Sequence, residues 1–358
     1  MVREHEVPAL RAIGRALPPH YYEQETLSAA LWEEWGGDDD GRARFERLHR
    51  AVGVRGRHLA RPMQDYRELR TFARANEAWT HAATDLSESA LQWALCRAGL
   101  EPRDVDHVFF TTVTGIASPS IDAKLINRLG MRADVKRTPL FGLGCVGGAA
   151  GVARAADYLR AFPDHVAVLI AVELCSLTLQ LDDRSTANVI ASALFGDGAA
   201  AVVLAGGARP HGALGPRVVA SRSMFFHETE ELMGWRIVDG GFQVMLGPGV
   251  PDLVRQRLRP AVDAFLAEHG LVRDDVIHWL AHTGGPKVLR AMEASLELPA
   301  DALARSWRSL KSIGNLSSVS VLHVAADLPE SRIARPGEYG MLLSMGPGFC
   351  GELVLLRW

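Results

Sequence analysis

Cysteine is scarce in this chain, and so are long apolar runs and an excess of charge of either sign. The 358 residues include four cysteines, which are widely spaced and form no CxxC pair. This spacing argues against a zinc site or a disulfide framework and fits reduced thiols in the cytoplasm. The formal charge of -3 argues against nucleic acid as the main partner.

The chain also lacks the signals of membrane insertion and export. No stretch of about 18 apolar residues is present, so we expect no membrane span. The first residues, MVREHEVPALRAIGRALPP, are mixed and charged, without the apolar run of a signal peptide. With 48% hydrophobic and 23% charged residues, the composition is that of an ordinary globular protein.

What is present is an alternation of helical and strand-like patterns. SESALQWALCRA predicts an amphipathic helix over Ser87 to Ala98, with Ser87 as its N-cap. The acidic run at 36–41, GGDDDG, predicts a solvated turn. Together with the apolar segments the pattern predicts an α/β fold. Four such segments predict buried strands: Val105 to Thr112, His165 to Val172, Ala199 to Ala205 and Glu352 to Trp358.

Two stretches of the chain resemble each other. GLEPRDVDHVFFTTVTG begins at Gly99 and GLVRDDVIHWLAHTGG at Gly270; each follows a helix-like segment and leads into an apolar strand. The GDG at 196–198 and the GPG at 346–348 likewise each precede the last strand of their half. We therefore predict two similar halves, residues 1–208 and 209–358, joined in the Gly- and Pro-rich segment near 205–220.

Cys145 lies in the segment FGLGCVGGAAG, flanked by glycines and followed by a helix of small residues. The glycines permit a sharp strand-to-helix turn, and the helix N-terminus would lower the pKa of the thiol. This favours a nucleophile in an elbow like that of serine hydrolases. The competing interpretation is a small cysteine packed in a turn, and the motif alone does not separate the two.

His282 and Asn315 are two further candidates. His282 ends the predicted strand of the second half, directly before a Gly-Gly-Pro turn, and α/β folds place ligands at such strand ends. It could act on a thiol or a carbonyl, or it could be an ordinary structural histidine. Asn315, in SIGNLSSVSVL, could donate its side-chain amide to an oxyanion or cap a helix.

Taken together, these motifs resemble those of the type III polyketide synthases, the chalcone and stilbene synthase superfamily of the thiolase fold. That family carries Cys, His and Asn in contexts like GC-xx-GG, H-x-GGP and GN-x-SS. Here these read GCVGG around Cys145, HTGGP from His282 and GNLSS around Asn315. ALFGDGAAA from Ala193 and the GPG at 346–348 match as well. The resemblance implies an α/β fold with five layers in the order αβαβα, made of two pseudo-duplicated halves. It also implies an acyltransferase activity.

The resemblance also implies a role for each residue of the triad. Cys145 would carry the acyl chain, and His282 would stabilise its thiolate. His282 and Asn315 would together stabilise the enolate that forms when malonyl-CoA loses CO2. Phe195 and Phe242 would act as gatekeepers between the CoA tunnel and the cavity. This chemistry requires no metal and no redox cofactor.

Further positions follow from the same resemblance. Arg44, Arg47 and Arg50 recur along one face of a helix, where they would bind CoA phosphates or simply form a solvated basic face. Gly285 and Lys287 would contact the pantetheine arm. The pocket beyond the cysteine would be shaped by Cys175, Thr178, Thr114, Ser317 and Pro347.

Cys175 indicates which kind of starter unit the enzyme would use. It stands where chalcone synthases have threonine, and it resembles bacterial alkylpyrone and alkylresorcinol synthases, as does TVTGIASPS from Thr112. We therefore expect a long fatty acyl-CoA or acyl-carrier-protein starter, extended with malonyl-CoA and cyclised to an alkylpyrone or alkylresorcinol. The family is homodimeric, with a loop near Ser118-Pro119 that reaches the partner's cavity.

Three alternatives remain. The first is a tetrahydroxynaphthalene-type synthase that uses malonyl-CoA alone. The second, a ketoacyl synthase III-like condensing enzyme, usually carries His-Gln-Ala-Asn where this chain has HTGG from His282. The third is a non-catalytic member of the fold that binds acyl-CoA or a partner subunit.

Overall fold

Nine strands form one mixed sheet in the computed structural model, which describes residues 7–209, 215–326 and 334–358. Their order is β11-β12-β13-β8-β1-β7-β6-β4-β5. β4 runs parallel to β5 and β6, and β11 runs parallel to β12, whereas the remaining pairs are antiparallel. The strands are β1 (Ala9–Ala16), β4 (His107–Thr112), β5 (Lys136–Phe141), β6 (Val166–Leu174), β7 (Asp197–Ala205), β8 (Arg217–Phe225), β11 (Val276–Ala281), β12 (Tyr339–Gly346) and β13 (Cys350–Arg357).

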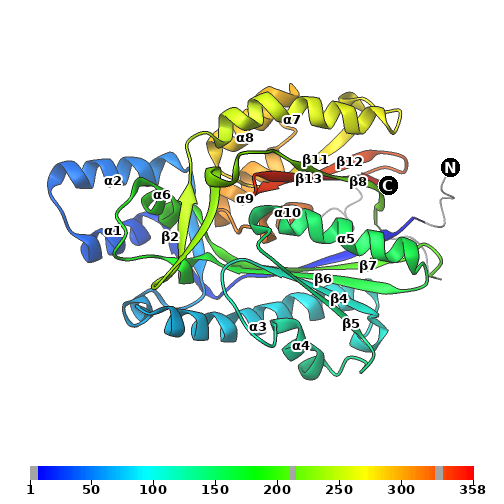
Figure 1. The fold of residues 1–358 in the computed structure, drawn as a ribbon, viewed down its shortest axis with the longest axis horizontal. Coiled ribbons are helices and arrows are strands. Elements are labelled where there is room, and N and C mark those ends of the chain that lie inside the picture. Colours follow the sequence, from blue (N-terminus) through cyan, green and yellow to red (C-terminus); the bar gives the residue numbers. More distant parts are fainter. Residues whose placement is uncertain (1–6, 210–214, 327–333) are drawn as a thin grey trace.

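Helices alternate with the two halves of the sheet in five layers (Figure 1). One outer layer contains α7 (Val250–Ala267) and α8 (Pro286–Leu296), and α9 (Ala304–Ile313) lies below them in Figure 1, in contact with α8 and with the edge strand β11. The central layer holds α5 (Gly147–Ala161) and α10 (Val319–Ala325), and the other outer layer holds α3 (Phe72–Ala98) and α4 (Ile121–Leu129). This arrangement confirms the predicted five-layered α/β fold.

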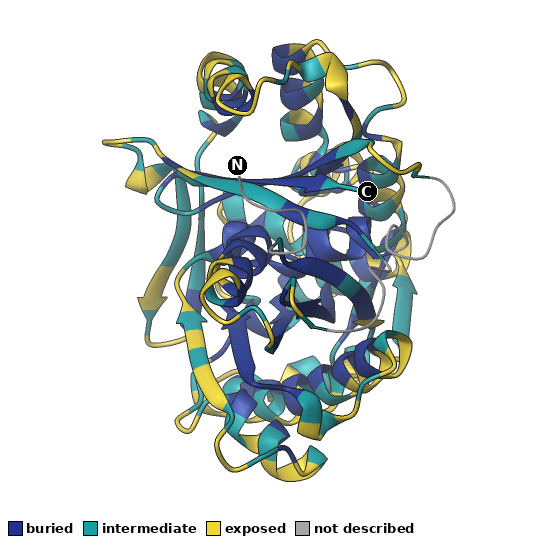
Figure 2. Ribbon diagram, turned by 90° about the vertical axis from the view of Figure 1, so that its right-hand side faces the viewer, coloured by how far each residue is buried: buried dark blue, intermediate teal, exposed yellow. Residues whose placement is uncertain are grey.

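The middle of the molecule is deeply buried (Figure 2), and most residues of the central helices belong to this core. α5 is rich in glycine and alanine, and these small residues let it pack tightly between the two halves of the sheet. A Cβ on Gly151 would lie 2.5 Å from Leu169 of β6. The small-residue run that follows Cys145 in the sequence is therefore explained by close helix-to-sheet packing.

The internal sequence similarity corresponds to a repeated local structure. Before β4, the carboxylate of Asp104 accepts a hydrogen bond from the backbone N–H of Glu101 at 2.8 Å. Before β11, Asp275 accepts from the N–H of Val272 at the same distance. The proposed boundary between residues 208 and 209 falls between β7 and β8, and residues 210–214 of the joining segment lie outside the described residues.

Two local predictions were wrong at helix starts. The helix expected to begin at Ser87 is the end of α3, which starts at Phe72 and is capped by Thr71, whose hydroxyl accepts from the N–H of Arg74. Ser87 is fully buried in its middle, because the helix crosses the sheet along its whole length. The acidic run at 36–41 begins α2 (Asp39–Ala51), with Asp38 as its N-cap.

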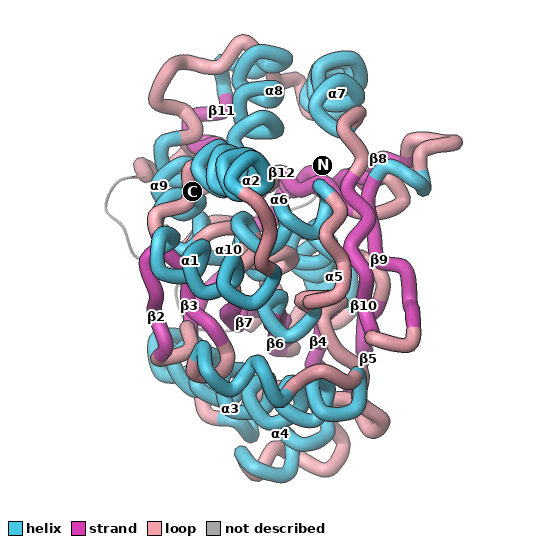
Figure 3. The backbone as a smooth tube through the Cα atoms, turned by 90° about the vertical axis from the view of Figure 1, so that its left-hand side faces the viewer, coloured by secondary structure: helices cyan, strands magenta, loops and turns pink. Residues whose placement is uncertain are grey.

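Several shorter elements gather at one end of the layers (Figure 3). They are α1 (Gln24–Trp35), α2, α6 (Thr186–Leu194), the β2–β3 pair (His20–Glu23 and Gly56–Leu59) and the β9–β10 pair (Met233–Val238 and Gly241–Leu246). Within the described residues, no helix is long and apolar enough to cross a membrane.

Candidate active site

Cys145 lies in a tight turn between β5 and α5. Gly144 adopts a φ of +52°, and a Cβ there would lie 2.7 Å from the ring of Pro347. A Cβ on Gly148 would lie 2.1 Å from the backbone oxygen of Ser318. The glycines around the cysteine are therefore needed both for the left-handed turn and for close contact with the segment that leads into α10.

The thiol of Cys145 is buried, with 3% of the residue exposed. Its Sγ donates a hydrogen bond to Oγ of Ser317 at 3.7 Å. Burial raises the pKa of the thiol to about 12, although hydrogen bonds with Ser317 and Asn315 oppose this shift. We expected the start of α5 to lower the pKa, but the loss of hydration has the larger effect.

His282 follows directly after β11 and is equally buried. Neither ring nitrogen has a hydrogen-bond partner among the described residues. Burial lowers the pKa of the imidazole to about 3, so an isolated His282 is neutral at physiological pH. Both of its nitrogens are therefore available to a substrate or to a neighbouring thiol.

Asn315 is held by its backbone and by its side-chain oxygen. Its N–H donates to the carbonyl of Leu194 at 2.8 Å, and its carbonyl accepts from the N–H of Gly196 at 2.9 Å. Oδ1 accepts from the N–H of Ser317 at 2.8 Å and from the hydroxyl of Ser320 at 3.3 Å. Because Oδ1 is occupied in this way, the side-chain NH2 is oriented as the donor.

The structure links Cys145 and Asn315 through a shared neighbour, and it links His282 to them through the strand that packs against the Cys145 turn. Asn315 and Cys145 share a contact with Ser317. The backbone N–H of His282 bonds to the carbonyl of Leu343 in β12, and Gly346 at the end of that strand packs against the turn, where a Cβ would lie 3.2 Å from the N of Cys145. Burial disfavours a charge on either Cys145 or His282 alone, so a thiolate here requires a cation beside it.

Glu173, which the sequence analysis did not single out, is a buried carboxyl close to this site. It accepts hydrogen bonds from the hydroxyls of Ser318 and Thr114 and from the N–H of Val113. Burial raises its pKa to about 7. A signal was present in the sequence, since Glu173 is the one charged residue in the apolar strand VAVLIAVEL.

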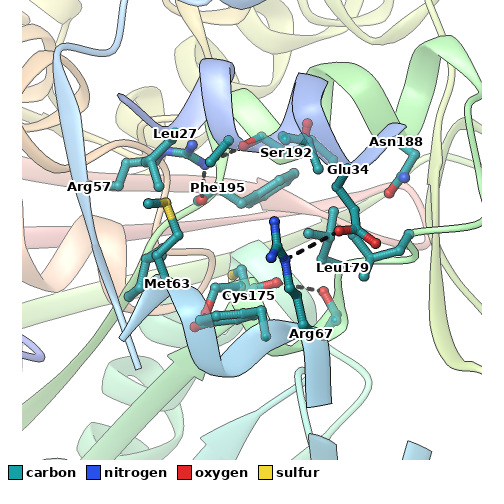
Figure 4. A pocket seen from close by; sticks show the side chains of 18 of the residues that line it. Leu27, Glu34, Arg57, Met63, Arg67, Cys175, Leu179, Asn188, Ser192 and Phe195 are labelled. Carbon is teal, nitrogen blue, oxygen red and sulfur yellow. Dashed lines mark hydrogen bonds and ion pairs between the residues drawn. The ribbon is translucent and has the colours of Figure 1, made fainter. Parts of the chain in front are cut away.

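A cavity of about 320 Å³ lies at the end of the molecule formed by α1, α6 and the β9–β10 pair (Figure 4). Cys175, Thr178 and Phe195 line it, as the pocket prediction requires. Its other walls carry polar and charged groups as well as apolar ones. These include Arg57, Tyr66, Glu34, Arg67 and Asn188.

The remaining predicted pocket residues lie outside the cavity wall. Phe242 packs edge-on against Trp235, which lines the cavity, with ring centroids 6.2 Å apart. Thr114, Ser317 and Pro347 lie instead around Glu173 and the Cys145 turn. Phe195 connects the two regions, because it forms a β-bridge with Asn315 and also lines the cavity.

The candidate CoA-binding residues are on two helices that both contact α6. Arg44, on α2, donates to the hydroxyl of Thr186 at the start of α6. Gly285, before α8, lies against Leu194 at the end of α6. Arg47 and Arg50 also lie on α2, where Arg50 pairs with Glu46, and Lys287 lies in the first turn of α8. These candidate CoA-binding residues therefore lie on α2 and at the start of α8, around α6.

Comparison with known proteins identifies the family. Residues 2–210 match the N-terminal domain of the chalcone and stilbene synthases, and residues 217–358 match their C-terminal domain. The chain therefore belongs to this family, the type III polyketide synthases, and is an enzyme of the acyltransferase type.

Its relatives include several bacterial enzymes. It is 54% identical over 354 residues to the 1,3,6,8-tetrahydroxynaphthalene synthase of Streptomyces peucetius, covering 98% of this chain and 93% of that one. It is 33% identical to the 3,5-dihydroxyphenylacetyl-CoA synthase of Streptomyces toyocaensis, covering 98% and 90%. The crystal structure of the 1,3,6,8-tetrahydroxynaphthalene synthase of Streptomyces coelicolor A3(2) superposes with a TM-score of 0.92 at 30% identity, covering 98% and 99%.

Proposed function

We propose that this enzyme is a tetrahydroxynaphthalene-type synthase that uses malonyl-CoA as both starter and extender. The observation that carries the proposal is the 54% identity, over nearly the whole of both chains, to a 1,3,6,8-tetrahydroxynaphthalene synthase. It favours the malonyl-only alternative over the fatty acyl starter that Cys175 suggested. A naphthalene skeleton has ten carbons, so it corresponds to five malonyl units that each lose CO2.

The cavity wall combines two characters. Most of it is apolar, which would suit an alkyl chain. Among its polar groups, the Tyr66 hydroxyl and the Asn188 amide already bond within the protein, whereas Arg57 has a buried N–H without a partner among the described residues. Such a donor suits a chain that carries a ketone oxygen at every second carbon.

In this proposal Cys145 is the nucleophile. Its sulfur attacks the thioester carbonyl of the starter CoA, its proton passes to His282, and CoA leaves as the thiol after taking that proton. This proton transfer from the Cys145 thiol to the His282 imidazole takes place in a buried site, where the thiolate is stable only beside the imidazolium. The chain is then held as a thioester on Cys145.

Extension uses His282 and Asn315 as donors. When the extender loses CO2, the electron pair of the broken carbon–carbon bond moves onto the thioester oxygen as an enolate. The NH2 of Asn315, whose Oδ1 is already occupied, and an N–H of His282 donate to that oxygen. The enolate carbon attacks the Cys145 thioester, and the sulfur of Cys145 leaves as the thiolate and takes up a proton from solvent. The extended chain is then a CoA thioester, and repetition of the loading step returns it to Cys145 and releases CoA.

Other assignments follow the family. We propose that Phe195 and Phe242 gate the cavity, that Arg44, Arg47 and Arg50 bind CoA phosphates, and that the segment at 285–287 binds the pantetheine arm. The chemistry needs no metal or redox cofactor, because decarboxylation itself supplies the carbanion. We also propose a homodimer: β5 is the edge strand of the sheet and exposes Phe141, an arrangement suited to pairing with a second copy.

The direct test is product formation from purified enzyme and malonyl-CoA alone, compared with reactions that also contain acyl-CoAs of short to long chain. We expect a product with the mass of tetrahydroxynaphthalene from malonyl-CoA alone, and no increase in total product when fatty acyl-CoA is added. An alkylpyrone formed only in the presence of a fatty acyl-CoA would contradict the proposal and favour a long fatty acyl starter instead.

A further inference from the structure

Arg57, in β3, is a buried cation whose hydrogen-bonding capacity is largely unused. The residue is 4% exposed. Its Nη1 donates to the backbone carbonyls of Ser192 and Phe195. Nε is buried without a partner, and Nη2 makes no hydrogen bond to any described residue. A guanidinium has five N–H donors, so three of them lack a partner within the described part of the protein.

Among the described residues, none forms a direct ion pair with Arg57 that would neutralise its charge. Asp197 attracts it, but the oxygens of that carboxylate are occupied by the N–H groups of Ala60 and Ser176 and by the Ser176 hydroxyl. Burial lowers the pKa of Arg57 to about 10, so it remains a cation at physiological pH. A buried cation with unused donors is costly unless something binds to it.

Arg57 is placed where a ligand could satisfy it. It lines the cavity together with Cys175 and Phe195, and Figure 4 shows it on the wall beside Phe195 and Ser192. Phe195, which lines the cavity with Arg57, forms a β-bridge with Asn315, and Asn315 and Cys145 both contact Ser317. A chain attached to Cys145 that enters the cavity past Phe195 would therefore lead toward Arg57.

We propose that Arg57 is a substrate-binding residue, whose free N–H donors hold the ketone or enolate oxygens at the distal end of the growing chain. The proposal rests on the polyketide-building function proposed above. A poly-β-ketone offers oxygen acceptors at a regular spacing, and a guanidinium fork can bind two of them at once. Holding the distal end extended would delay early ring closure and release, so that more units are added.

The test uses Arg57→Lys, which keeps the charge but removes the fork, with Arg67→Gln as the matched control. Arg67 lines the same cavity, but it is exposed and already pairs with Glu34. Both variants and the wild-type enzyme are incubated with malonyl-CoA, and the released products are separated by chain length. We expect Arg57→Lys to lower the ratio of full-length to shorter, early-released products by at least about tenfold, the effect of losing a hydrogen bond to a charged donor.

Measuring the acylation of Cys145 distinguishes a substrate-binding role of Arg57 from a purely structural role. Because Arg57 also holds the backbone of Phe195, a purely structural role would slow acylation, malonyl-CoA decarboxylation and all products together. The proposal requires that Arg57→Lys keep acylation and decarboxylation within about twofold of wild type while the chains become shorter. An unchanged product ratio, or an equal loss of every activity, overturns it.

A second variant covers the case in which Arg57→Lys does not fold. Arg57→Met combined with Asp197→Asn removes both buried charges, so that neither is left in the interior without the opposite charge that attracts it. The same shortening is expected from this double variant, and wild-type chain lengths from it would refute the proposal. If the wild-type enzyme proves to need an acyl starter, the proposed function fails, but chain length with that starter tests Arg57 in the same way.

Discussion

The partnership of Cys145 and His282 can be tested by replacing His282 with glutamine. A thiol with a pKa of about 12 is ionised in only about one molecule in 10⁵ at pH 7, whereas an ordinary thiol with a pKa of 9.0 is ionised in about one in 10². Without a cation beside it, Cys145 should therefore react with iodoacetamide about 10³-fold more slowly than a free cysteine. Its rate should also rise about tenfold per pH unit up to pH 10.

The assay measures alkylation of each cysteine by mass spectrometry of peptides over a range of pH. The wild-type enzyme should react faster at Cys145, with a rate that levels off at a lower pH, because the imidazolium of His282 stabilises the thiolate. Exposed Cys96 serves as an internal reference, and His49→Gln as a control, since His49 is also buried with a pKa of about 3. Identical rates and pH profiles for wild type and His282→Gln would refute the reasoning.

Further predictions concern the surroundings of the thiol. Asn315→Ala should slow malonyl-CoA decarboxylation by about 10²–10³-fold while Cys145 is still alkylated, as measured by CO2 release and peptide mass. Glu173 has a folded-state pKa of about 7 against an ordinary 4.5, so the folded protein binds the extra proton and stability should fall as pH rises from 4.5 to 7, by about 3 kcal/mol. Glu173→Gln should remove that part of the pH dependence in denaturant unfolding, and an unaltered pH dependence would exclude the assignment. Gly148→Ala should destabilise the fold by about 1–3 kcal/mol, because the new methyl group meets a backbone oxygen of Ser318, and an unchanged melting temperature would contradict the close approach.

Much of the fold could be predicted from local patterns. The strands β4, β6 and β7 are apolar runs buried on both faces, and their composition alone predicts them. The start of α3 could not be predicted in the same way. Its first half has a weak apolar pattern, and Ser87, which resembles an N-cap, is buried in the middle of the helix instead.

The candidate site, like the fold, has features that the sequence predicts and features that it does not. Cys145, His282 and Asn315 stand in short motifs, so sequence alone could single them out. The direction of the Cys145 pKa shift could not be predicted, because burial is a property of the assembled layers rather than of the turn. The importance of Arg57 depends on contacts with residues about 135 positions away, and no short motif encodes them.

The most direct test of the central claim is the mass of the Cys145 peptide after the wild-type enzyme has been incubated with malonyl-CoA alone and rapidly quenched. The account predicts acyl groups on Cys145, including chains longer than a single unit, while Cys96, Cys175 and Cys350 remain unmodified. An unmodified Cys145 in a reaction that forms product, or acylation that occurs only when a fatty acyl-CoA is supplied, would contradict it.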